Sequence, residues 1–139
     1  MLLGGRSVLG QQVKSPIDAH ELVKRGLPSA ALQSLLHKFV VLKPDVAVHQ
    51  AMGLSVRTIQ RRKETPQPLS IEQSSRVWRF AEILAHATNV LGSQEEAEKW
   101  LEQPAVGLGY RRPIDLLATP PGTEMVESLL TRMEYGVYI

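Results

Sequence analysis

The amino-acid sequence predicts an all-α protein. Apolar residues recur at helical spacing in several segments, as at Leu32, Leu35, Leu36 and Phe39, and no stretch of useful length alternates as a strand does. Proline, glycine and serine divide the chain at intervals that suit short helices. At 139 residues, the chain has the size of one domain, or of two small domains that share a core.

The first helices are recognised by their ends. Ser15 precedes a proline that suits the first turn of a helix, and Gly26 can end that helix. Residues 1–14 hold three glycines and no sustained period, so we expect a flexible arm there. Asp45 is the expected cap of the third helix. Counted from their caps, the expected helices are 15–25, 28–39, 45–52, 56–63, 70–91, 93–101, 113–118 and 121–135.

Two later helices begin with the spacing of a capping box, Ser70 with Gln73 and Ser93 with Glu96. The first of them is long and ends at a glycine. The second is short and acidic. Its glutamates are expected to form a solvated face or, alternatively, to bind a partner: Glu95, Glu96 and Glu98.

Composition excludes several classes of chemistry. The chain is 43% hydrophobic and 22% charged, as is typical of globular proteins, and it has no cysteine for disulfides or thiolate metal sites. The four histidines are scattered, and neither a Ser-His-Asp arrangement nor a glycine-rich phosphate loop is present. We therefore expect no catalytic residue, no metal, no cofactor and no small-molecule substrate.

The apolar runs are far shorter than a membrane span. The N-terminus has a short apolar character but lacks the pattern of a signal peptide. The sequence therefore predicts a cytoplasmic protein without a membrane partner.

Charge is divided unevenly along the chain. Residues 1–79 hold twelve Lys/Arg against five Asp/Glu, whereas residues 80–139 hold four against nine. The first part therefore carries +7 and the second −5. This asymmetry indicates that the N-terminal part binds a polyanion and that the C-terminal part has another task, although chance can produce such a division.

One cationic segment has the form of a helix-turn-helix. The sequence DVAVHQAMGLSVRTIQRR supplies two short helices joined at a glycine. Gly53 suits the turn because it can adopt a positive φ, and Ser55 can cap the second helix. Leu54, Val56 and Ile59 are expected to face inward. The outward side chains of such a helix meet bases and phosphates. The candidate DNA-binding residues are Ser55, Arg57, Thr58, Gln60, Arg61, Arg62 and Lys63.

Another interpretation of this segment is a solvated amphipathic helix on a small bundle. His49 also departs from the usual pattern, because many helix-turn-helix units have a small residue four positions before the turn glycine. Either its ring lies at the rim, or the two helices are spaced more widely than usual.

The C-terminal run EEAEKWLEQPAVGLGYRRPIDLLATPPGTEMVESLLTRMEYGVYI resembles the toxin-binding domain of the Xre/MbcA/ParS antitoxins. The segments SVRTIQRRK and LSIEQSSRVWRFAEIL fit the same family, so the resemblance covers about residues 25–139. The elements that carry it in the C-terminal run are Trp100-Leu101, Pro104, Leu108-Gly109, Pro113, Asp115-Leu116-Leu117, Thr119, Gly122 and Tyr135-Gly136-Val137-Tyr138.

The resemblance implies an antitoxin of a type II toxin-antitoxin system. Such antitoxins bind and neutralise a RES-domain toxin that degrades NAD, and they repress their own operon through the helix-turn-helix. The expected organisation is a flexible arm (1–14), a helix-turn-helix domain (15–69) and a helical toxin-binding and dimerisation domain (70–139). We expect a homodimer, because two-fold operators match two-fold proteins. Its seam is expected along residues 77–91, unless that apolar stripe is simply part of the core.

The toxin-binding candidates are polar or terminal positions, rich in the tyrosine and arginine that dominate interface energetics. They are Arg111, Arg112, Glu134, Tyr135, Gly136, Val137, Tyr138 and Ile139. The tail 134–139 places two tyrosines around a glycine and ends in a carboxylate, and it is expected to plug the active site of the toxin. Alternatively, the tyrosines fold back over the last helix. Two other functions stay open: a stand-alone regulator whose C-terminal half only dimerises, and a small helical enzyme.

Overall fold

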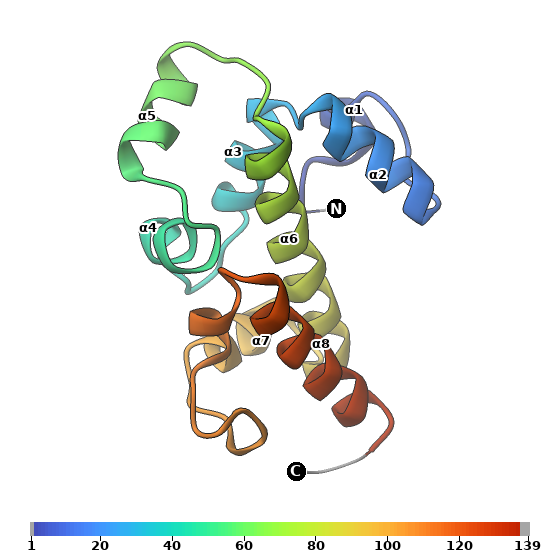
Figure 1. Ribbon diagram of the computed structural model, residues 1–139, viewed down its shortest axis with the longest axis vertical. Helices are drawn as coiled ribbons and strands as arrows, with labels where there is room; N and C mark the ends of the chain where they lie inside the picture. The colour runs from blue at the N-terminus through green and yellow to red at the C-terminus, as the bar shows by residue number, and fades with distance from the viewer. Residues whose placement is uncertain (1, 137–139) are drawn as a thin grey trace.

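The computed structural model describes residues 2–136, and for Val48 and Val56 it describes the backbone alone. This part of the chain is helical and contains no strand, which confirms the all-α prediction (Figure 1). One isolated antiparallel bridge joins Ala105 to Arg111. The elements are α1 Gly5–Leu9, α2 Pro16–Arg25, α3 Ser29–His37, α4 Pro44–Val46, the π-helix η1 Ala47–Ala51, α5 Val56–Glu64, α6 Ile71–Leu91, α7 Gln94–Leu101, the 3₁₀ helices η2 Val106–Leu108 and η3 Pro113–Leu116, and α8 Pro120–Glu134.

Helix α6 is the centre of the fold, and α2, α7 and α8 pack against it. Its start is the predicted capping box: the Gln73 N–H donates to Ser70 Oγ and the Ser70 N–H donates to Gln73 Oε1, both at 3.1 Å. The helix ends at Gly92, whose φ of 95° suits glycine. The side chains of α6 that are buried in the core are Ser74, Val77, Phe80, Ala81, Ile83, Leu84 and Ala87.

The helices gather at the two ends of α6 (Figure 1). Helices α1, α2 and α3 lie toward its N-terminal end, whereas α7, α8 and the loop that follows α7 lie toward its C-terminal end. Helix α5 stands out from the body near the first of these ends. The fold therefore places the cationic helix far from the C-terminal segments.

The N-terminal residues differ from the expected flexible arm. Residues 5–9 form the short helix α1, which packs against α3. Leu3 and Leu9 are 1% and 4% exposed, so both belong to the core. The expectation failed because one turn of helix has too few residues for a period to show, and the leucines in and before it are buried against a distant part of the chain.

The third predicted helix begins two residues earlier than expected. Pro44 occupies its first turn and Lys43 the cap position, so Asp45 is not the cap. Proline is favoured there because its missing N–H has no partner to lose. The helix continues as the π-helix η1, in which the Met52 N–H donates to the Ala47 carbonyl at 3.1 Å. Ala47 and Ala51 of η1 are buried, as is Met52, which follows it.

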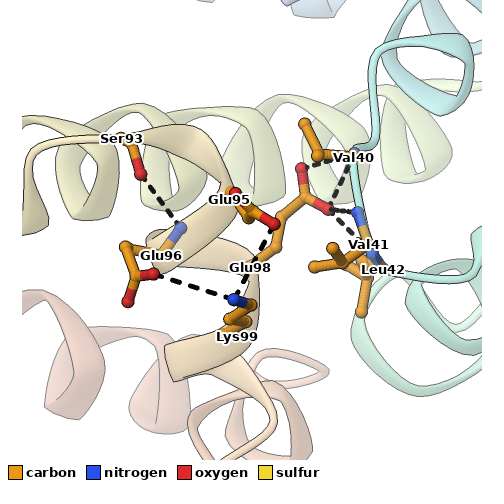
Figure 2. A network of polar contacts seen from close by, with 8 residues as sticks. All are labelled: Val40, Val41, Leu42, Ser93, Glu95, Glu96, Glu98 and Lys99. Carbon is orange, nitrogen blue, oxygen red and sulfur yellow. Dashed lines mark hydrogen bonds and ion pairs between the residues drawn. The ribbon is translucent and has the colours of Figure 1, made fainter.

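A buried carboxylate joins α7 to the segment that follows α3 (Figure 2). Glu98 of α7 is 0% exposed, so the prediction of a solvated Glu98 is wrong, although Glu95 and Glu96 are exposed. The carboxylate accepts the N–H groups of Val40, Val41 and Leu42 at 2.8–3.0 Å. Gln94 Nε2 also donates to it at 2.7 Å. Burying a charge is tolerated where donors surround it in this way.

This contact fixes the segment that leads into the helix-turn-helix. Residues 40–42 lie between α3 and α4, outside any helix, so their N–H groups need acceptors from elsewhere. Glu98 supplies the acceptors for all three, and Gln94 Nε2 also donates to the Lys38 carbonyl at 2.7 Å. Helix α7 thereby sets the path of the chain just before α4.

A second polar contact joins the same two regions. Arg112, just before η3, pairs with both oxygens of Asp115 at 2.9 Å and donates to Gln50 Oε1 at 3.1 Å. Gln50 lies on η1, which packs against η3. The helix-turn-helix region is therefore held from the C-terminal region at two places.

We predict that Glu98→Gln lowers the free energy of unfolding by about 2–4 kcal/mol, because an amide of the same shape turns an N–H toward donors and leaves buried groups without partners. Glu95→Gln, on the exposed side of the same helix, is the matched control and should change it by less than about 0.5 kcal/mol. Urea unfolding of both variants measures the difference. Equal stability of the two variants would contradict a structural role for the buried carboxylate.

Candidate functional site

The predicted helix-turn-helix has its expected turn and cap. Gly53 has a φ of 65°, and the following Leu54 is 4% exposed and anchors the turn in the core. Ser55 Oγ accepts the Thr58 N–H at 3.0 Å and lies 2.8 Å from Thr58 Oγ1. Helix α5 therefore begins at a fixed point, with its first turn presented to solvent.

Helix α5 carries its charges outward and is lightly packed. None of its described side chains is fully buried, and Ile59 is half-buried. Below it, a cleft of about 290 Å³ separates α5 from α3 and α4; its lining residues are Gln33, Leu36, His37, Pro44, Asp45, Ile59 and Lys63. The exposed candidates for DNA contact are Ser55, Arg57, Gln60, Arg61 and Lys63, and Thr58 is half-exposed.

Arg62 lies differently from the other candidates. It is half-buried, and its guanidinium nitrogens donate to Gln67 Oε1 at 3.4 Å and to Gln73 Oε1 at 3.5 Å. Its Nε is buried without a partner in the described part of the chain. Because Gln73 belongs to the cap of α6, Arg62 braces the end of α5 against α6 rather than facing outward. His49 is exposed, as expected if its ring lies at the rim.

The C-terminal candidates divide into exposed and engaged side chains. Arg111 and Tyr135 are exposed, and Gly136 has a φ of 77° at the end of α8. Arg112 is half-buried and is committed to the contact with Gln50 and Asp115, which is a structural role that the sequence did not indicate. The remaining tail candidates, Val137, Tyr138 and Ile139, lie outside the described residues.

Glu134 is held by a histidine. His86 of α6 lies between two carboxylates of α8: its Nδ1 is 3.1 Å from Glu127 Oε2, and its Nε2 is 3.1 Å from Glu134 Oε2. Burial raises the pKa of nearby Glu82, and the charge of Glu127 raises that pKa further, whereas a hydrogen bond with Trp78 opposes the shift. The contacts of His86 with Glu127 and Glu134 fasten the C-terminal end of α8 to α6, at the start of the tail.

The described residues offer little else for chemistry. Within residues 2–136, no group of three or more His, Asp or Glu side chains is arranged to hold a metal ion. No helix in this range is long and apolar enough to cross a membrane. What the geometry presents is a cationic helix at one end and a C-terminal surface at the other.

Two family models match the chain, one at each end. The Antitoxin Xre-like helix-turn-helix domain matches residues 18–82, and the Antitoxin Xre/MbcA/ParS C-terminal toxin-binding domain matches residues 86–136. Both contain the segments that the geometry singles out.

The chain belongs to the Xre/MbcA/ParS-type antitoxins.

Curated relatives agree with this assignment. The antitoxin is 29% identical over 125 residues to Antitoxin Xre of Pseudomonas putida, which covers 90% of this chain and 76% of the relative. It is 32% identical over 96 residues to Antitoxin Xre of Yersinia enterocolitica, which covers 68% and 65%. It is 27% identical over 133 residues to the Prs ADP-ribosylating antitoxin of Sphingobium sp., which covers 89% and 82%. The predicted family is thereby confirmed, and a toxin is a partner of this chain.

The sequence interpretation missed one part of the C-terminal surface of the antitoxin. Val106, Tyr110 and Met125 are large apolar or aromatic side chains that are 59%, 73% and 46% exposed. Two of them belong to the loop between α7 and η3, and the third lies on α8. The signal that was available is the aromatic residue directly after Gly109 in the segment GLGY, between the expected helices 93–101 and 113–118.

Proposed function

We propose that this antitoxin neutralises a RES-domain, NAD-degrading toxin by direct binding and represses its own operon through α5. The observation that supports the proposal most is the separation of two exposed surfaces on one frame: α5 near one end of α6 and the toxin-binding domain near the other (Figure 1). In this proposal the antitoxin acts by binding rather than by catalysis.

Operator binding follows from the exposed side of α5. Its first turn offers Ser55, Arg57 and Thr58 to base edges, because residues at the start of a recognition helix meet the major groove. Gln60, Arg61 and Lys63 lie farther along the helix and suit phosphate contacts. Arg62 supports this surface indirectly, by holding α5 to α6.

We propose a homodimer, because one helix-turn-helix makes few base contacts and two-fold operators match two-fold proteins. The apolar stripe of α6 is not its seam: Val77, Phe80, Ile83 and Leu84 are buried within a single chain. A dimer must therefore use another surface. A light-scattering mass that corresponds to one chain at every concentration would contradict the dimer.

The partner toxin is proposed from the family and from chemistry. One relative is named for ADP-ribosylation, a reaction whose ordinary donor is NAD. An enzyme that consumes NAD must hold its pyrophosphate with cationic groups, and a bound protein blocks it most directly by covering that cleft. Contacts are proposed for Arg111, Glu134, Tyr135, Gly136 and the tail residues Val137, Tyr138 and Ile139, with Arg112 acting within the fold.

We predict that Arg57→Ala changes the operator sequence preference, whereas Arg61→Ala weakens binding to all sequences and reduces the salt slope by about one unit. Lys99→Ala, an exposed cation on α7, is the matched control and should leave both unchanged. Operator titrations at several salt concentrations measure these effects. Normal operator binding by the Arg57 and Arg61 variants would identify α5 as a solvated face.

We predict that a gene for a RES-domain toxin lies beside the gene of this antitoxin, and that co-expression of the two proteins restores growth and keeps cellular NAD at its level without toxin. The Arg57 and Arg61 variants should protect equally well, because α5 lies far from the toxin-binding domain. Growth and NAD assays of the co-expressing cells measure this outcome. Failure of soluble antitoxin to protect would exclude this toxin as its target.

A further inference from the structure

The loop between α7 and η3 is closed by its own hydrogen bonds. The Ala105 N–H donates to the Arg111 carbonyl at 3.1 Å, and the Tyr110 N–H donates back to the Ala105 carbonyl at 2.9 Å. Within the loop, the N–H groups of Leu108 and Gly109 donate to residues 105 and 106 at 3.0 and 3.1 Å. Leu108 is 2% exposed and anchors the loop in the core. Residues 105–111 therefore form a fixed platform rather than a loose connection.

Tyr110 projects from this platform at a conformational cost. Its φ is 63°, the only positive value at a non-glycine residue in the described chain. An L-residue pays roughly 1–2 kcal/mol for this backbone conformation, which glycine adopts without penalty. The side chain is 73% exposed, so packing within the fold does not repay the cost. Strain that the fold does not use is a sign of function.

The platform borders a groove. A cleft of about 430 Å³ lies between it and α8, with Gly107 and Leu108 on one wall. Met125 and Leu129 supply apolar surface on the other wall, and Arg132 adds a cation. Val106, on the same platform, is 59% exposed. The platform that carries the exposed Tyr110 thus also forms one wall of a largely apolar groove with charged residues, which is the composition of a protein interface.

We propose that Tyr110 is an anchor residue for the toxin, inserting its ring into an apolar pocket of the toxin while Val106 and the groove along α8 pack around it. This inference rests on the proposed neutralisation by direct binding and names a surface for it. The toxin is the occupant because the platform and the groove lie wholly within residues 86–136, the stretch that matches a toxin-binding domain. Helix α5, which faces the operator, lies toward the opposite end of α6 (Figure 1).

The decisive variant is Tyr110→Gly, because it should affect stability and toxin binding in opposite directions. Glycine relieves the backbone strain, so the Tm should stay unchanged or rise. Loss of the ring should weaken binding of the toxin encoded beside the antitoxin gene by about tenfold or more. Tyr110→Phe keeps the ring and should bind as the unaltered antitoxin does. Calorimetric titration and thermal unfolding of the full-length variants measure the two effects.

Ile17 of α2 is a comparably exposed apolar residue, 61% exposed, and Ile17→Ala is the matched control. This variant should leave toxin binding unchanged. Tyr110→Gly that binds the toxin as tightly as the unaltered antitoxin overturns the proposal. A marked fall in Tm also overturns it, because the ring would then be part of the fold. A change in light-scattering mass without a change in toxin affinity overturns it too, because Tyr110 would then belong to a self-association surface. If the unaltered antitoxin itself fails to bind this toxin, the proposed function fails instead.

Discussion

The buried carboxylate of Glu98 is the interaction on which the arrangement of this antitoxin depends. It lies on α7, in the C-terminal region, and its partners are three consecutive N–H groups at the entrance to the helix-turn-helix. A chain that leaves α3 without forming a helix has to satisfy those groups elsewhere, and the carboxylate that accepts them is itself 0% exposed and needs donors in turn. The acceptor that serves them also places the C-terminal region against the N-terminal one, so a local requirement of the backbone determines the long-range geometry.

The result is one frame with two surfaces of different character. Around α6, the core is continuous and takes leucines from nearly every element. Helix α5 projects from this frame with few buried contacts and is braced by Arg62. Its exposed side can therefore enter a groove of DNA. The platform 105–111 is the opposite: hydrogen bonds and Leu108 fix it, and Tyr110 is held outward at a backbone cost. Low packing suits a helix that fits into DNA, and rigidity suits an anchor that loses little entropy on binding.

What was predictable from the sequence was local. The cap at Ser55, the capping box at Ser70 and the stops at glycines depend on residues within a few positions, and all are present. Glu98 was misread because its partners are more than fifty residues away, and beside Glu95 and Glu96 it has the pattern of a solvated face. The half-buried position of Arg62 was not predictable for a similar reason: its neighbours fix the charge of the segment, but only the fold shows which side each cation faces. The strain at Tyr110 is a property of the backbone, which no residue pattern states.

Hydrogen-exchange footprinting of the antitoxin, alone and bound in turn to its operator and to the toxin, tests the two-surface account most directly. The account predicts that operator DNA slows exchange in residues 55–63 and leaves residues 105–111 and α8 unchanged. The toxin should slow exchange in residues 105–111 and along α8 and leave 55–63 unchanged. Protection of residues 55–63 by the toxin, with residues 105–111 unaffected, would contradict it.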